Sequence, residues 1–126
     1  MLHGILRSTV YVRVRKNRFD VRHVESGREA TVTSETPFTT IRLLVGEFPV
    51  AESALPAAMK DVKYGVPHLV APTVVMHPLE MIEGGLSAVE HRVLMEVAHG
   101  AGAKRVTVWV GPVLTDDEVR EKARAA

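Results

Sequence analysis

The segment from Gly85 to Pro112 constrains the fold of this chain more than any other part of its sequence. Ser87 and Glu90 stand three residues apart ahead of an apolar run, which is the spacing of a capping box at a helix start. In that motif each side chain accepts a hydrogen bond from a backbone N–H group that the helix leaves unpaired. The apolar residues that follow recur every four positions and predict a helix face directed at a core: Val89, Val93, Val97 and Ala101.

Two glycines then predict the end of this helix. Gly100 and Gly102 can adopt the left-handed conformation that commonly ends a helix. Val106 to Val110 is a short run rich in β-branched residues, bounded by Pro112, and it predicts a strand. The segment therefore predicts a helix, a tight turn and a strand.

The N-terminal third has the alternation of β-strands. Val10, Val12 and Val14 alternate with Tyr11, Arg13 and Arg15, which predicts a strand with one basic face. A turn at 16–18 leads to a second strand through Phe19, Val21 and Val24, and Ala30 to Thr33 follows as a third. Thr39 to Val45 is another β-rich run, closed by Gly46, so we expect three or four antiparallel strands.

The remaining elements alternate between helix and strand. Residues 51–63 predict a helix that places Leu55, Met59 and Val62 on one side. Ser53 as its N-cap would put Pro56 in the first turn, where the missing N–H is not needed. The apolar run from Val70 to Met76 predicts a strand covered on both faces, and a second capping box predicts a short last helix from Thr115 and Glu118.

This order predicts an α/β protein in which an antiparallel β-meander is followed by helix, strand, helix, strand and helix on a mixed sheet. That is the ribonuclease H-like layout and also the plan of actin subdomain IA, although the predicted elements alone leave several mixed α/β folds open. An apolar fraction of 46% and a charged fraction of 25% are ordinary for a globular domain, so residues 1–126 predict one domain.

Charge and cysteine content bound the class of protein. The formal net charge is +1, but residues 1–30 hold seven Lys/Arg against three Asp/Glu, so the charge is uneven. The chain has no cysteine, which excludes a disulfide framework and thiolate chemistry. The most apolar stretch, Val66 to Leu79, is broken by prolines and histidines and is too short to span a bilayer. We expect a soluble cytoplasmic protein without a membrane span.

The segment from Gly85 to Pro112 also resembles a stretch of the bacterial actin homologue MreB, the rod-shape-determining protein family. The family pattern there is roughly G-x-T-x-V-E-R-R, an amphipathic helix, and G-A-G-A-[KR]-x-V-x-L-I-E-E-P. The residues of this chain that match the pattern in an alignment without gaps are Gly85, Ser87, Val89, Glu90, Arg92, Gly100 to Ala103, Val106 and Pro112. The resemblance implies one actin-like subdomain of the IA type, without the family's second phosphate loop.

The nucleotide-binding motif of that family is degenerate in this chain. Proteins of that family begin with a phosphate loop of the form D-x-G-T-A-N-T-x-I-Y-V. In this chain Gly4 and Val10 to Val12 match that motif, and by this resemblance Gly4 is a remnant of the phosphate loop. Leu2 replaces the acidic residue that helps to hold hydrated Mg²⁺, and Ile5 replaces the hydroxyl residue that meets phosphate. Apolar side chains offer no oxygen ligand to a hard cation. We therefore expect no cofactor.

Glu90 matches the position that, by resemblance to the family, orients the attacking water. Orientation of the attacking water cannot by itself catalyse phosphoryl transfer when the phosphate loops and Mg²⁺ are absent. We interpret Glu90 as the carboxylate of the capping box and predict no catalytic residue.

The six histidines raise the question of a metal site. No histidine has a helical partner at the i, i+4 spacing, and His91 and His99 are two turns apart. Without cysteine, a site would require distant side chains to converge. We predict no metal site and histidines that face solvent.

Five cations crowd the first hairpin. We call Arg13, Arg15, Lys16, Arg18 and Arg22 the basic hairpin and predict an interaction surface there. A solvated strand face that prevents promiscuous edge pairing is the simplest interpretation, and an acidic protein partner is the next. Interleaved with Tyr11 and Phe19, these cations could also follow a phosphate backbone, which is the least favoured interpretation.

We therefore expect a non-catalytic, actin-like protein-interaction module linked to bacterial cytoskeleton or cell-shape assemblies. Its expected partners are a second copy, through an exposed sheet edge, or an actin-like filament protein. One alternative is a nucleotide-binding or ATP-hydrolysing unit completed by another chain. A further alternative is nucleic-acid binding through the basic hairpin.

Overall fold

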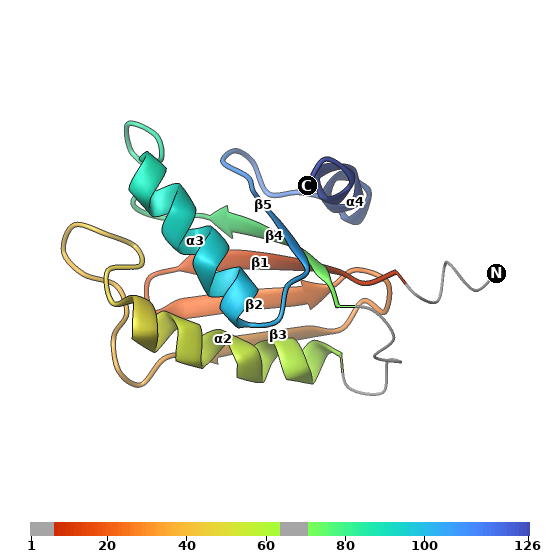
Figure 1. Cartoon of the computed structure of the whole chain (residues 1–126), viewed down its shortest axis with the longest axis horizontal. Helices are drawn as coiled ribbons and strands as arrows, with labels where there is room; N and C mark the ends of the chain where they lie inside the picture. The colour runs from red at the N-terminus through yellow and green to blue at the C-terminus, as the bar shows by residue number, and fades with distance from the viewer. Residues whose placement is uncertain (1–6, 64–70) are drawn as a thin grey trace.

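The computed structural model describes residues 7–63 and 71–126. Within these ranges five strands and three helices form one mixed sheet with flanking helices, so the predicted α/β class is confirmed (Figure 1). In chain order the elements are β1 (Thr9–Arg15), β2 (Arg18–His23), β3 (Glu29–Thr33), α2 (Phe48–Val62), β4 (Thr73–Pro78), α3 (Ala88–Gly100), β5 (Arg105–Val108) and α4 (Asp116–Arg124).

The strand order is β3-β2-β1-β4-β5. β1, β2 and β3 are antiparallel neighbours, whereas β4 lies parallel to β1 and β5 parallel to β4. Parallel strands require a long crossover connection, which is usually a helix. Here α2 connects β3 to β4, and α3 connects β4 to β5. The predicted meander followed by alternating helices and strands is confirmed, with three antiparallel strands rather than four.

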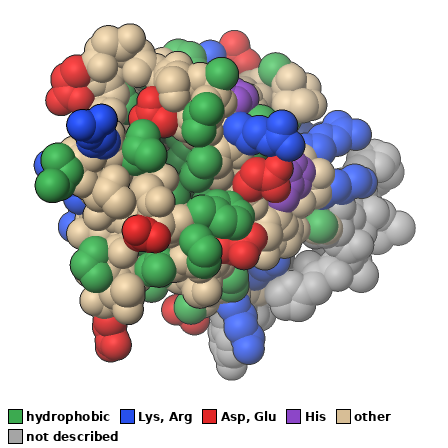
Figure 2. Space-filling model, turned by 60° about the vertical axis from the view of Figure 1, so that its left-hand side comes forward, with side chains coloured by type: hydrophobic (Ala, Val, Ile, Leu, Met, Phe, Trp, Pro, Cys, Tyr) green, Lys and Arg blue, Asp and Glu red, His purple; other side chains and the backbone are tan. Residues whose placement is uncertain are grey.

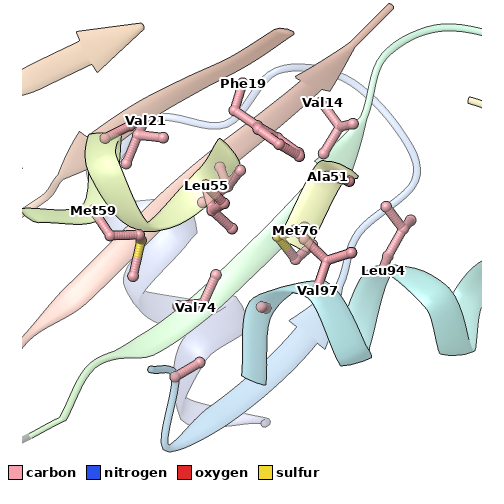
Figure 3. Close-up of a cluster of buried hydrophobic side chains, with 14 of the residues drawn as sticks. Val14, Phe19, Val21, Ala51, Leu55, Met59, Val74, Met76, Leu94 and Val97 are labelled. Atoms are coloured by element: carbon pink, nitrogen blue, oxygen red, sulfur yellow. The ribbon is translucent and has the colours of Figure 1, made fainter. Parts of the chain in front are cut away.

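The larger core lies between one face of the sheet and helices α2 and α3. Val10, Val12 and Val14 of β1 point to this face, as their alternation predicts. The predicted helix face of Leu55, Met59 and Val62 is buried against them. Figure 3 shows the two layers meeting through side chains of both sheet and helices, among them Phe19, Val74, Met76, Leu94 and Val97.

The opposite face of the sheet is covered only in part. Tyr11 and Val75 form a smaller cluster there with Val119 of α4. α4 packs on β1, β4 and β5, so α4 leaves β2 and β3 uncovered on this side. The uncovered part carries the polar residues of the first hairpin.

The β-rich run from Thr39 to Val45 does not form the predicted fourth strand. The Asn17 side chain accepts hydrogen bonds from the backbone N–H groups of Phe38 and Thr39, at 2.9 and 2.8 Å. Within the run, the Thr40 N–H group donates to Leu43 O, and the Thr39 hydroxyl donates to Leu44 O. These bonds satisfy backbone groups that a strand would pair in a ladder, so the segment is a compact loop.

α2 begins earlier than predicted. Its N-cap is Glu47, and Pro49 occupies the first turn, so the predicted N-cap at Ser53 is wrong. Ser53 lies inside the helix, where its hydroxyl donates to Pro49 O at 2.9 Å. Pro56 is also internal to α2, which means that Pro49 has the first-turn role that the prediction gave to Pro56.

α3 has the predicted capping box but a different buried face. Val97 is buried, whereas Val89 is 68% exposed, so Val89 does not face the core as predicted. Residues spaced by four drift about 40° per step around a helix of 3.6 residues per turn, which turns Val89 away from the sheet. Leu94 and Ala98 complete the buried face.

The two predicted parallel strands are present with shifted bounds. β4 runs from Thr73 to Pro78, and Val70 lies outside the described residues. β5 ends at Val108, two residues before the predicted end at Val110. Gly102, two residues after α3, has the expected positive φ of 103°, whereas Gly100 is the last residue of the helix and does not have a positive φ.

Candidate functional site

The arginines of the basic hairpin lie on the face of β1 and β2 that points away from the larger core, and Lys16 lies at the turn between the two strands. The strand register places Arg13 opposite Asp20 and Arg15 opposite Arg18, so these side chains share one face. Asp20 accepts from Arg15 Nε and from Arg18 Nη2, both at 3.1 Å. The Thr31 hydroxyl donates to the same carboxylate at 3.0 Å. Burial raises the pKa of Asp20, but these three donors together hold it below its usual value.

Arg22 connects the hairpin to the last helix. Its Nε and Nη2 atoms donate to the two carboxylate oxygens of Asp116, each at 2.8 Å, in a bidentate ion pair. Arg22 Nη1 also lies 3.3 Å from Glu29 Oε2, and Arg13 Nη2 lies 4.0 Å from the same oxygen. Four cations of the basic hairpin therefore pair with carboxylates, which reduces the positive charge left for an outside partner.

Two histidines are buried, contrary to the prediction that histidines face solvent. His77 is fully buried, and its Nε2 atom lies 2.7 Å from the carbonyl oxygen of Gly111. Because a carbonyl only accepts, Nε2 carries the proton, and Nδ1 accepts from the Tyr11 hydroxyl at 2.7 Å. The Tyr11 oxygen in turn accepts from Leu114 N at 3.1 Å. Burial lowers the pKa of His77 and raises that of Tyr11, so both side chains are neutral partners in a structural network.

The second buried histidine, His23, lies between two serines. Its Nδ1 atom accepts from Ser26 N at 3.2 Å, and its Nε2 atom lies 3.2 Å from Ser8 Oγ. Glu25 Oε1 is 3.7 Å from the same Nε2 atom. In a catalytic triad the carboxylate faces Nδ1 and the nucleophile faces Nε2. Here Nδ1 faces Ser26 and Nε2 is the donor, so His23 does not activate Ser8 as a nucleophile.

Glu90 is a helix cap. Its Oε1 atom accepts from Ser87 N at 3.1 Å, and Glu90 N donates to Ser87 Oγ at 3.1 Å. The interpretation as a capping box is therefore confirmed, and Thr115 with Glu118 forms the second predicted box.

Other predicted positions are placed as follows. Leu2, Gly4 and Ile5 of the phosphate-loop comparison lie outside the described residues. His91 and His99 are exposed on α3, and within residues 7–63 and 71–126 no group of three or more His, Asp or Glu is placed to hold a metal ion. None of the helices described is long and apolar enough to cross a membrane.

The outer edge of β3 has backbone groups that no strand within residues 7–63 and 71–126 pairs. Two backbone hydrogen bonds at the ends of the β2–β3 ladder, from His23 N to Arg28 O and from Ser34 N to Asn17 O, fix which residues of β3 bond inward to β2. Hydrogen-bonded pairs alternate along an antiparallel ladder. It follows that Ala30 and Val32 bond to β2, whereas the backbone groups of the residues between and beside them point outward: Glu29, Thr31 and Thr33.

A groove of about 540 Å³ runs between this edge and α2. On α2, Val50, Ala54 and Ala57 line it at helical spacing, and their small side chains leave the space open. Val32 of β3 lines the opposite wall. The sequence analysis missed this groove because the spacing of small residues in α2 does not indicate which strand lies beside them.

Apolar side chains also reach the surface elsewhere. Ile41 is 98% exposed in the loop before α2, and Phe48, Val89 and Val93 line a smaller depression of about 370 Å³ beside α3. Figure 2 shows apolar side chains at many points of one face, with acidic side chains between them. Isolated exposed apolar residues of this kind are ordinary on a protein surface.

The fold and these surfaces define an α/β protein with a five-stranded mixed sheet, in which the antiparallel strand β3 lies at one edge of the strands described. The chain is 39% identical over 99 residues to the uncharacterized protein YjaA of Escherichia coli (strain K12), and the match covers 75% of this chain and 76% of that protein. This chain belongs to the YjaA family. No protein-family model matches it.

Proposed function

We propose that this chain is a non-catalytic protein-interaction module with a ribonuclease H-like layout of the actin subdomain IA kind. The strand order β3-β2-β1-β4-β5, with an antiparallel first half and two parallel crossovers, supports that layout. The segment from Gly85 to Pro112, with its resemblance to MreB, supports a link to bacterial cytoskeleton or cell-shape assemblies. A cytoplasmic location is part of the same proposal.

The observation that carries the proposal is the free edge of β3 beside the groove of α2. Exposed strand edges pair readily with another strand, which is a common mode of protein recognition. The occupant we propose is a second copy of this chain, joined to the first by antiparallel pairing of the two β3 edges.

The stereochemistry of β3 suits such self-pairing. A two-fold axis at Thr31 pairs this residue with its copy and pairs Glu29 with the Thr33 of the other chain, and all three direct their backbone groups outward. Ala30 then lies opposite Val32 of the other chain. No two like charges face each other in this register, and the pairs of Thr with Thr and Ala with Val are compatible with a sheet.

Helix α2 adds a second contact in this arrangement. The same axis brings the α2 groove of one chain toward the α2 groove of the other, with Val50, Ala54 and Ala57 at its surface. Small side chains allow two helices to approach closely. Sheet and helix together would bury more surface than a strand edge alone, as a stable dimer needs.

Sedimentation velocity at increasing protein concentration tests this proposal. We expect the wild-type chain to form a dimer, and we expect Thr31→Pro to shift it to a monomer because proline removes an outward N–H group. Ala57→Glu is a second variant that leaves β3 intact and places a charge in the groove. Ala88→Glu, at the exposed start of α3, is its matched control and should remain dimeric.

Circular dichroism of each variant establishes that it is folded before its mass is compared. A wild-type chain that stays monomeric at all concentrations would overturn the proposed self-association. Binding of an extended segment from another protein to the monomer, lost in Thr31→Pro and Ala57→Glu, would also overturn it, because that result assigns the edge to a different partner.

A further inference from the structure

A cleft of about 370 Å³ lies at the end of the sheet where β1, β4 and β5 begin. The parallel register places Thr9 beside Thr73 and Thr73 beside Arg105, so these side chains form a row on the face that α4 covers. The C-terminal half of α4, with Arg120 and Arg124, forms the other wall. Three strands and one helix thus hold the walls of the cleft in place.

The lining of this cleft is strongly basic. It contains five cations and no carboxylate among the described residues: Arg7, Lys104, Arg105, Arg120 and Arg124. In the described part of the chain, Arg120 pairs with Asp117, whose side chain is 96% exposed, and the other four cations have no ion pair. A pair with so exposed a partner contributes little. Within residues 7–63 and 71–126, carboxylates therefore neutralise little of the positive charge of the cleft.

The carboxylate of Glu25 contacts the cleft lining through the backbone of Thr9. Glu25 Oε1 accepts from the backbone N–H of Thr9 at 2.7 Å and lies 3.7 Å from His23 Nε2. The Oε1 atom of Glu25 is therefore engaged with the backbone of β1 and with a side chain of β2. The hydroxyl groups of Ser8, Thr9 and Thr73 remain as neutral donors around the cations.

We propose that this cleft binds a small molecule that carries two or more phosphoryl groups. Arginine forks donate to phosphate oxygens in pairs, and several converging cations match the charge of a compact polyanion. A volume of about 370 Å³ is within the range of small-molecule sites.

The lining also argues against single-stranded nucleic acid as the ligand. Proteins that bind single strands combine cations with aromatic side chains on which the bases stack. The described lining contains no aromatic residue. Since β3 and β5 are at opposite edges of the sheet, the cleft does not depend on the proposed pairing of β3.

Like charges held together in a cleft repel each other in the absence of a counter-ion. A polyanion that binds the folded state alone raises the melting temperature by mass action. Removal of cleft cations should therefore leave the melting temperature of the ligand-free protein unchanged or slightly higher. It should also reduce the increase that the ligand produces, which a merely structural role of these residues would not predict.

Calorimetric titration with pyrophosphate in EDTA tests the proposal, with a sugar bisphosphate as a second probe. The variants are Lys104→Gln with Arg105→Gln in the cleft, and Lys16→Gln with Arg92→Gln as a control of equal charge elsewhere on the surface. We expect saturable binding of one pyrophosphate per chain, and backbone amide shifts at Thr9, Thr73 and Arg105 in NMR spectra. The double substitution in the cleft should weaken binding at least tenfold, which is about 1.4 kcal/mol, because it removes two charged donors to the phosphate oxygens.

Tighter binding of pyrophosphate would indicate a ligand with directly linked phosphates. Tighter binding of the sugar bisphosphate would indicate a ligand that carries its phosphates on separate carbon atoms. Both results support the proposal. Equal affinity of the two double variants would overturn it, as would the absence of saturable binding at millimolar concentrations of both probes. Binding of an RNA oligonucleotide that pyrophosphate does not displace would also overturn it, in favour of nucleic acid.

Discussion

The Tyr11 hydroxyl lies 2.7 Å from Nδ1 of His77, and both side chains are buried between the sheet and the segment that precedes α4. Every polar atom of the two rings has a partner, since His77 Nε2 donates to Gly111 O and the Tyr11 oxygen accepts from Leu114 N. The central strand β1 and its neighbour β4 are thereby joined to the loop after β5. Buried polar networks of this kind stabilise a fold only while all members are satisfied.

Removal of the hydroxyl alone should be costly. Tyr11→Phe keeps the ring but leaves His77 Nδ1 and the Leu114 N–H without a partner in the interior. We expect the free energy of unfolding to fall by about 1–3 kcal/mol, as measured by urea denaturation. Ser53→Ala, which removes an exposed hydroxyl bonded to Pro49 O, should change it by less than about 0.5 kcal/mol. Equal effects of both substitutions would contradict this role of Tyr11.

The buried histidines should make stability depend on pH. Burial lowers the pKa of His23 and His77 below the ordinary value of 6.5, so between the folded and unfolded pKa values the unfolded state binds more protons. The stability that these two groups confer is therefore fully present above pH 6.5 and lost as the pH falls below it. Urea midpoints measured from pH 8 to pH 5 should decrease with acidification. His77→Gln should reduce the slope, whereas His91→Gln, at an exposed site on α3, should leave it unchanged.

The elements that the sequence predicted correctly depend on local patterns. The alternation of Val10, Val12 and Val14 specifies a strand without reference to the rest of the chain, and the capping boxes at Ser87 and Thr115 are complete within four residues. The loop at 39–45 was predicted as a strand because its β-rich composition is local, whereas the side chain of Asn17, which satisfies part of its backbone, is distant in sequence.

The candidate sites depend on topology that no local pattern contains. The groove of α2 exists because β3 is an edge strand, and the sequence does not state which strand lies at the edge. The basic cleft likewise brings Arg7, Arg105 and Arg124 together from three separate regions. The burial of His77 could have been suspected from its place in an apolar run between Met76 and Pro78, but its partner Tyr11 could not.

The capping box of α3 gives a direct test of the structural interpretation of Glu90. Ser87→Ala should lower the free energy of unfolding by about 1 kcal/mol, because the N–H group of Glu90 loses its acceptor. Glu90→Gln should be nearly neutral, since glutamine can accept from Ser87 N in the same way. Thermal denaturation followed by circular dichroism distinguishes the two, with Glu96→Gln as a control on the same helix. A larger loss for Glu90→Gln than for Ser87→Ala would show that the carboxylate does more than cap the helix.

The ion pair of Arg22 with Asp116 should stabilise the attachment of α4 to the first hairpin. Asp116→Asn retains the shape of the side chain but removes its charge, and both groups are partly exposed, at 28% and 39% of their side-chain areas. Solvent screening therefore limits the expected loss to about 1 kcal/mol near neutral pH. Asp117→Asn, at a side chain that is 96% exposed, should cost less.

The pH dependence of the difference in unfolding free energy between wild type and Asp116→Asn tests whether the charge of Asp116 is responsible. The hydrogen bonds from Arg22 hold the pKa of Asp116 below its ordinary value of 3.8, so the stability that it confers is present above pH 3.8 and lost as the pH falls through the folded value. The gap in unfolding free energy between wild type and Asp116→Asn should therefore narrow in strong acid. It should also narrow in high salt, because salt screens partly exposed charges. A gap that is independent of both pH and salt would mean that Asp116 acts through packing or capping of α4 rather than through its charge.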